Sequence, residues 1–438
     1  LMQLERATGA GGFDYGTGRR PPIESFIFGG ALGQTVSDHY PFRKQTEVKR
    51  NTKIVVTFFP AIDPGSIIEN TNNTCVGAGG VATSEGCELD AEGKILQPYF
   101  GDCIFPAGVA FDQQVHCDHL KKNAVKIFVS PDQQDGQELD PDAPEPELLD
   151  ALAFTTYEDG VERNARTFVF QSTDSLGSDE DDVWYTVELT GEILKKSNAE
   201  VPLLDVPYIW EFQTDTEFDY NPPHVISVFP ARAREAFRNS IIKITFDEPI
   251  DPTVVQGLSG TEPDTSFNNI IFDDPIGGVD IRGEWKISNG YRTVEFVSED
   301  ACGLNSCGEP MYCLPVQCDD AADIDCVAPY EILIRTAVRA RQDLIHSFES
   351  IPFSGVMDMS GNALDGNADG NPDGKPTVGN PKIITPADEN TSGERVPDNY
   401  VWNFSVKNDI DREPPYIEDV LPRLDEEDVI GDAEVKLI

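Results

Sequence analysis

Three short sequence blocks each occur twice in this chain of 438 residues, in the same order and at nearly constant spacing. The copies are PPHVISVFP (222–230) and PPYIEDVLP (414–422), RNTKIVVTFFPAIDP (50–64) and RNSIIKITFDEPIDP (238–252), and YIWEF (208–212) and YVWNF (400–404). A weaker copy of the first block, PPIESFIF, begins at Pro21. Blocks that repeat in order at a fixed spacing indicate tandem structural units. The chain is therefore expected to fold as an array.

The repeats define the expected domain organisation. We predict one unit over residues 21–220, a second over 221–413 and the first strands of a third over 414–438, with residues 1–20 as a linker or the tail of a preceding unit. The third unit stops just before its expected Thr-Phe, so we interpret the chain as a segment of a longer array. In the alternative interpretation, another chain completes the third unit by strand addition.

Short apolar runs predict an all-β fold. Segments such as 54–59, 183–189 and 241–246 are rich in β-branched and aromatic residues and have the length of strands. The 36 Gly and 32 Pro separate these runs with turns, and convincing helical periodicity is scarce. Many short strands with such turns are typical of β-sandwiches, which need only about 100 residues each. Units nearly twice that long must carry long insertions, and the cysteines lie where the insertions are expected.

The order of the blocks resembles the bacterial Ig-like domains of the SbsA-like type, found in S-layer and other surface proteins. The matching features are Thr245-Phe246 ahead of Ile250-Asp251, the Asp358-x-x-Gly-Asn segment and the final Trp402-x-Phe strand. This resemblance implies tandem Ig-like β-sandwiches in a repetitive surface architecture. Spacers, S-layers, adhesins and modules attached to secreted enzymes are the implied roles.

Nine cysteines favour an oxidising compartment. They fall in two loop-rich clusters, Cys75, Cys87, Cys103 and Cys117 in the first unit and Cys302, Cys307, Cys313, Cys318 and Cys326 in the second. Clusters of this kind suit disulfides, because a small insertion cannot bury a core of its own. The alternative, a metal site, is disfavoured because no Cys-x-x-Cys pair occurs. Four cysteines permit three pairings, and the odd cysteine of the second cluster is either free or bonded to another chain.

The best chemical signal is a candidate calcium loop. Oxygen-bearing side chains alternate along the segment beginning DGNADGNPDG, at Asp365, Asn367, Asp369, Asn371 and Asp373. Alternating oxygen ligands with a glycine at the sixth position let one loop wrap a hard cation, as in the first half of an EF-hand loop or in thrombospondin- and dockerin-type repeats. Pro376 stands where an EF-hand has its bidentate Glu. The alternative is a solvated turn rich in Asp and Asn.

A second group of possible metal ligands is His116-Cys-Asp-His119, for which we favour an exposed loop, since a disulfide at Cys117 would remove one ligand. No His-Glu-x-x-His, Gly-x-Ser-x-Gly or phosphate-loop motif is present, so we predict that the protein is not an enzyme. The 78 acidic and 33 basic residues give a net charge of −45, which disfavours nucleic acids and anionic membranes as partners. The sequence contains no apolar run of about 18 residues, so we predict no membrane span in this segment.

These observations favour a structural role. The leading hypothesis is a secreted or cell-surface array, bacterial or archaeal, which forms a stalk, filament or S-layer-like assembly with copies of itself or with other surface proteins. A second hypothesis is an adhesin or glycan-binding protein, with the cysteine-bearing insertions as recognition loops. A third is an accessory region of a secreted enzyme.

Overall fold

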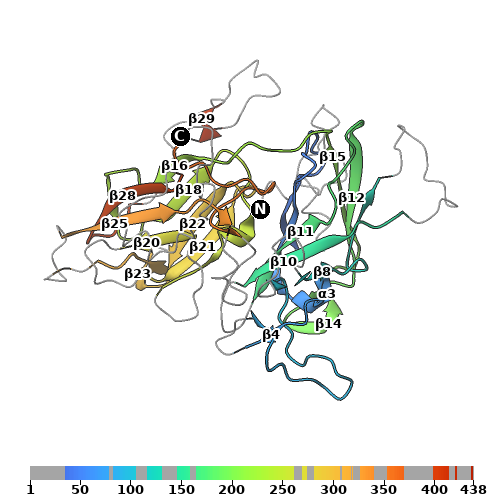
Figure 1. Cartoon of the computed structure of the whole chain (residues 1–438). Coiled ribbons are helices and arrows are strands. Elements are labelled where there is room, and N and C mark those ends of the chain that lie inside the picture. The colour runs from blue at the N-terminus through green and yellow to red at the C-terminus, as the bar shows by residue number, and fades with distance from the viewer. Residues whose placement is uncertain are drawn as a thin grey trace, which may run out of the picture.

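A computed structural model shows the protein as two groups of β-sheets, which lie side by side in Figure 1. The structure describes residues 35–77, 82–104, 116–130, 146–157, 164–260, 269–273, 281–305, 308–316, 318, 326–339, 353–368, 398–413, 420–421 and 436–437.

The first group contains two sheets. Sheet 1 has the order β14 (Asn198–Pro202), β13 (Leu194–Lys195), β2 (Ile54–Ile62), β11 (Ala165–Ser172), β10 (Ala151–Tyr157), β8 (His119–Leu120) and β3 (Ile68–Glu69), and β1 (Val36–Tyr40) also pairs with β2. Sheet 2 has the order β15 (Tyr208–Thr214), β12 (Val183–Leu189) and β9 (Val125–Val129). Residues of both sheets share one buried core, which includes Phe58, Phe168 and Trp210. Sheets 1 and 2 therefore form a β-sandwich.

The second group repeats this plan. Sheet 3 has the order β16 (Val225–Phe229), β18 (Ile242–Phe246), β22 (Thr293–Ser298), β21 (Gly283–Ser288) and β19 (Gly257–Ser259). Sheet 4 has the order β17 (Glu235–Phe237), β28 (Tyr400–Lys407), β25 (Val327–Ile334) and β20 (Ile270–Asp273). Strand β25 alternates buried and solvent-facing residues, as a strand with one buried face must. Phe246, Tyr330 and Trp402 lie in the second core. The predicted all-β sandwich class is confirmed.

The two sandwiches have equivalent local structure, and it is not confined to the repeated blocks, since β1 lies outside the weak copy that begins at Pro21. A cis-proline follows β1 at Pro41 and β16 at Pro230. Asp63 caps the short helix α3 (Pro64–Ile67), and Asp251 caps the 3-10 helix η2 (Pro252–Val254), each through its side chain. In each sandwich, the strand that ends at the cis-proline pairs with the strand that follows the Arg-Asn dipeptide, β1 with β2 and β16 with β18.

The start of the third predicted unit, residues 414–438, follows the same pattern. Strand β29 (Val420–Leu421) pairs with β30 (Lys436–Leu437), and the pairing of Leu421 with Lys436 repeats that of Phe229 with Lys243. The domain boundaries themselves stay a prediction, because residues 1–34 and 414–419 lie outside the described part of the chain.

Four disulfides hold the insertions together. They join Cys75 to Cys87, Cys103 to Cys117, Cys302 to Cys313 and Cys318 to Cys326. The sequence left the pairing open, and a pair of short strands accounts for one of the four bonds. Strand β6 (Cys103–Ile104) pairs with β7 (His116–Cys117), which sets the two cysteines opposite each other. The remaining short pairs are β4 (Cys75–Val76) with β5 (Ala82–Thr83), β23 (Ala301–Leu304) with β24 (Pro310–Tyr312), and β26 (Val338–Arg339) with β27 (Phe353–Ser354). Cys307 lies outside the described residues.

Candidate functional site

The contact between the two sandwiches, which we call the junction, is the most elaborate site in the described residues. One part of the junction is the Asn51 side chain, which binds the backbone of the segment that follows β15. The Asn51 Nδ2 donates to the Asp219 carbonyl at 2.9 Å, and the Asp219 N–H donates to Asn51 Oδ1 at 2.8 Å. Asn239 and Asp411 make the same two bonds in the second sandwich, at 2.8 and 2.9 Å. The repeated Asn therefore fixes the chain as it leaves each sandwich.

A buried ion pair crosses the junction. The Lys53 Nζ lies 2.5 Å from Asp251 Oδ2, and the two side chains are only 9% and 1% exposed. The other carboxylate oxygen of Asp251 accepts bonds from the N–H and hydroxyl of Thr253. The backbone N–H groups of Lys53 and Asp251 donate to the carbonyls of Met359 and Met357, so the same loop holds both partners. Such a pair fixes geometry well, because separating it would leave a charge buried alone.

An apolar core surrounds the ion pair. Val55 on β2, Val169 on β11 and Phe154 on β10 form one buried cluster with Tyr291 and Met359 of the second sandwich. The neighbouring residues on β2 and β11 point into the first sandwich core instead, so sheet 1 is buried on both faces. A sheet covered on both faces cannot swing freely against its neighbour.

The turn between β21 and β22 makes this close contact possible. Asn289, Gly290 and Tyr291 all have positive φ, at 52°, 60° and 65°. A Cβ on Gly290 would lie 2.7 Å from the Phe42 ring, so only glycine fits at this approach. The Tyr291 hydroxyl hydrogen-bonds the Thr57 hydroxyl at 3.0 Å.

Three carboxyl groups meet beside the linker between the sandwiches. Oxygens of Asp219, Glu248 and Asp358 lie within 4.8 Å of one another. Burial, with the nearby carboxylates of Asp358 and Asp219 adding to it, raises the pKa of Glu248 to about 8. Burial likewise raises the pKa of Asp358 to about 6. A group of this kind shares protons or holds a hard cation. It is the sole group of three such ligands within the described ranges.

These carboxyls predict a pH-dependent stability in calcium-free buffer. A carboxyl with a raised pKa binds more protons in the folded state than in the unfolded chain. Its contribution to the free energy of unfolding is fully present when the pH lies below the pKa of the same group in the unfolded chain. This contribution is lost as the pH rises through about 6 for Asp358 and about 8 for Glu248. Urea denaturation should therefore give a lower free energy of unfolding at about pH 8 than at about pH 5. Glu248→Gln should flatten this dependence, and an unchanged slope in that variant would contradict the assignment.

The structure describes only the beginning of the candidate calcium loop. Asp365 is buried, and its N–H donates to the Pro223 carbonyl at 2.9 Å, so the loop starts beside the linker. The Asn367 Nδ2 donates to Asp398 Oδ1 at 3.1 Å. Asp369, Asn371 and Asp373 lie outside the described residues. Sequence reasoning missed Asp398, because a long insertion separates it from the loop and no motif marks it.

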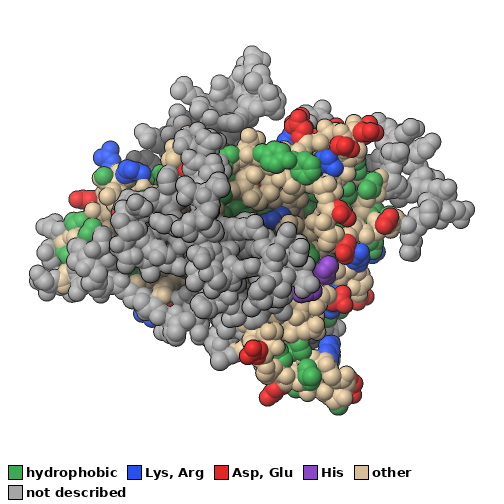
Figure 2. All heavy atoms as spheres, in the orientation of Figure 1, with side chains coloured by type: hydrophobic (Ala, Val, Ile, Leu, Met, Phe, Trp, Pro, Cys, Tyr) green, Lys and Arg blue, Asp and Glu red, His purple; other side chains and the backbone are tan. Residues whose placement is uncertain are grey.

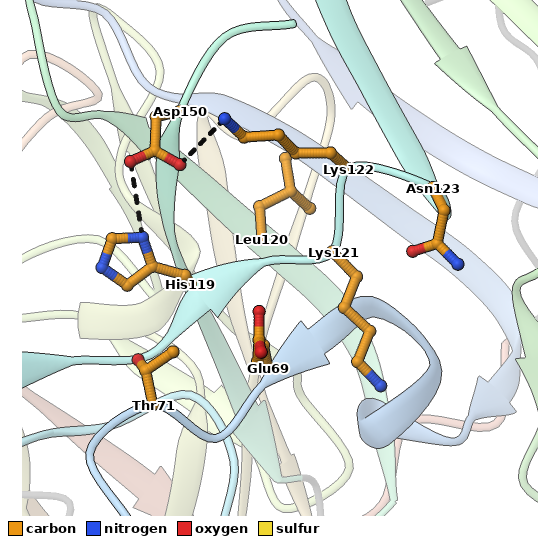
Figure 3. Close-up of a pocket in the computed structure, with 8 residues that line it drawn as sticks. All are labelled: Glu69, Thr71, His119, Leu120, Lys121, Lys122, Asn123 and Asp150. Atoms are coloured by element: carbon orange, nitrogen blue, oxygen red, sulfur yellow. Dashed lines mark ion pairs between the residues drawn. The ribbon is translucent and has the colours of Figure 1, made fainter.

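The His116-Cys-Asp-His119 segment is not the exposed loop that the sequence favoured, because it forms strand β7 and the start of β8 and buries Cys117 and Asp118. Cys117 is in a disulfide, and the buried Asp118 carboxylate accepts the N–H groups of Thr71 and Gly101 at 3.0 and 2.9 Å. His119 lines an open pocket of about 530 Å³. Figure 3 shows the His119 and Lys122 side chains directed at Asp150, at 3.7 and 3.2 Å. The Lys121 ammonium points away, and it donates to the Gly65 carbonyl.

A second cavity, of about 470 Å³, lies between the sandwiches, and we call it the inter-unit cleft. Its apolar lining comes from both sandwiches, with Leu152, Phe154 and the Cys103–Cys117 disulfide from the first and Met357 from the second. Its charged lining residues are Arg50, Lys53 and Asp174. Because Lys53 is paired with Asp251, Arg50 is the basic side chain that the cleft can offer to a ligand, beside the Asp174 carboxylate.

A scan against protein-family models finds no match, and a search of the curated proteins finds none either. Across the described residues, no helix has the length and apolar character needed to cross a membrane. Four disulfides are typical of chains that fold in an oxidising, extracellular compartment.

Proposed function

We propose that this chain is a non-enzymatic structural protein of a bacterial or archaeal surface, in which consecutive sandwiches form a stiff array. The junction is the observation that carries this proposal. The second sandwich buries the outer face of sheet 1, and Lys53 and Asp251 pair across the contact. Domains that only share a flexible tether do not need a buried contact of this kind. Stiffness between consecutive units suits a stalk, filament or S-layer-like coat.

The repeats extend the proposal beyond the first junction. Asn239 holds Asp411 as Asn51 holds Asp219, and β29 and β30 begin the pattern again. The resemblance of the blocks to SbsA-like Ig domains supports a repetitive surface protein. In this proposal each sandwich presents its outgoing chain in a fixed direction to the next one.

We also propose that calcium binds the loop beginning at Asp365 and stiffens the junction. Support comes from the alternating oxygen side chains in the sequence and from the contact between Asp365 and the linker residue Pro223. Calcium should raise the melting temperature of the full chain, and EDTA should reverse the shift. The double variant Asp369→Asn/Asp373→Asn should lose the shift. A shift that persists in this variant would place the ion elsewhere.

Assembly tests the proposed function itself. The full chain with calcium should form regular or elongated assemblies under negative-stain electron microscopy as its concentration rises. Wild-type protein that stays monomeric at high concentration in calcium would count against a self-assembling array.

A further inference from the structure

One disulfide-anchored hairpin projects from the first sandwich without packing on either core. It spans residues 87–97, which we call the stapled hairpin, and Cys87 bonds Cys75 at its base. Leu89 pairs with Ile95, and the Leu96 N–H donates to the Glu88 carbonyl at 2.9 Å. The Asp90 carboxylate accepts the N–H groups of Glu92 and Lys94 at 3.0 and 2.7 Å and so builds the turn. The hairpin is thus preorganised without help from a core.

This rigid hairpin exposes leucine on both of its faces. Leu89 is 56% exposed and Leu96 is 55% exposed, and their positions in the hairpin pairing place them on opposite faces. The trace below β4 reaches away from both groups of sheets in Figure 1, and hydrophobic and acidic side chains lie side by side on that projection in Figure 2. Docking elements typically expose large apolar side chains on a rigid segment. Rigidity favours binding because little conformational entropy is lost when the segment docks.

The inter-unit cleft offers this hairpin an apolar lining and a basic side chain. The hairpin carries three acids, Glu88, Asp90 and Glu92, against one base, Lys94. The cleft has an apolar lining and the Arg50 guanidinium, which donates to the Leu176 carbonyl and the Ser175 hydroxyl, whereas Lys53 is already paired with Asp251. Two copies with a net charge of −45 repel each other, so an acidic element of one copy is better placed against an acid-poor surface of the other than against another acidic one.

We propose that the stapled hairpin of one copy docks at the inter-unit cleft of a second copy, with one of its two leucines as the buried anchor. The inference deepens the proposed function and rests on it, since it names the contact through which copies assemble. Hairpin and cleft are different surfaces, so the contact is heterologous and adds copies head to tail instead of closing a dimer. The junction builds the receptor cleft, which links assembly to the fixed arrangement of the sandwiches.

Sedimentation velocity of the full chain over a concentration series tests the contact. Wild-type protein should sediment faster as its concentration rises. Leu89→Asp or Leu96→Asp should weaken association by at least about tenfold, because the variant loses the apolar anchor and must desolvate a carboxylate in its place. Gln171→Trp, at an exposed position lining the cleft, should do the same by filling it. Leu304→Asp is the matched control, since Leu304 is 64% exposed on another hairpin closed by a disulfide, and it should associate like wild type.

Mixing variants gives the sharpest result. The leucine variant that fails to associate keeps an intact cleft, and Gln171→Trp keeps an intact hairpin. The mixture should therefore form a heterodimer and stop there. If wild-type protein assembles and both leucine variants assemble equally well, the hairpin contact is wrong while the proposed function stands. If wild-type protein does not assemble, the proposed function fails together with the contact.

Discussion

Replacing Lys53 by Met should destabilise the junction by about 3–5 kcal/mol, because it leaves the Asp251 carboxylate buried without its partner. Asp251 is 1% exposed in the described structure and gains little from water. Differential scanning calorimetry should show a single transition for the wild type, and in the variant this transition should split or its midpoint should fall. The variant Lys53→Met/Asp251→Ser should recover much of the loss, because it removes both charges and keeps a side chain able to cap η2.

The matched control for this variant is Lys49→Met. Lys49 also forms ion pairs, with Asp215 and Glu217 at 2.5 and 2.9 Å, but at a more exposed position within the first sandwich. Exposed pairs contribute at most about 1 kcal/mol, so this variant should stay close to wild type. Equal losses from Lys49→Met and Lys53→Met would show that the buried pair has no special role at the junction.

Removing the Cys103–Cys117 disulfide should lower the free energy of unfolding by about 3 kcal/mol, because the unfolded chain gains conformational freedom. It should also loosen the junction. Both cysteines lie in the cluster that joins Val55 and Phe154 to Tyr291. The double variant Cys103→Ser/Cys117→Ser should therefore increase hydrogen exchange in the β21–β22 turn around Tyr291.

The Cys75–Cys87 bond provides the control for this effect. It closes a loop of similar length, with a sequence separation of 12 against 14, so its removal has a similar effect on the unfolded chain. Neither Cys75 nor Cys87 belongs to the junction cluster. Cys75→Ser/Cys87→Ser should leave exchange around Tyr291 unchanged, and an equal increase in both variants would contradict a junction role for Cys103–Cys117.

The all-β fold could be predicted from sequence because it depends on local patterns. Runs such as 241–246 alternate apolar residues within a few positions, and that alternation reports directly on which face of a strand is buried. The repeated blocks revealed the duplication for the same reason. The cysteine pairing could not be derived, because it depends on short strands such as β6 and β7 that composition does not mark.

The junction was out of reach of sequence reasoning for a different reason. Lys53 and Asp251 lie in different sandwiches, and each is unremarkable in its own segment. Asn51 and Asn239 stood out as repeated residues, but their role depends on where the chain leaves each sandwich. Asp219, Glu248 and Asp358 carried no signal among 78 acidic residues. The calcium ligands Asp369, Asn371 and Asp373 stay a prediction.

Small-angle X-ray scattering of the wild-type chain in dilute solution tests most directly whether the two sandwiches form one stiff body. A single relative arrangement of the two sandwiches should fit the wild-type scattering curve, and the Lys53→Met curve should require a range of arrangements. A wild-type curve that requires many relative orientations of the sandwiches would contradict a stiff junction and the structural role proposed from it.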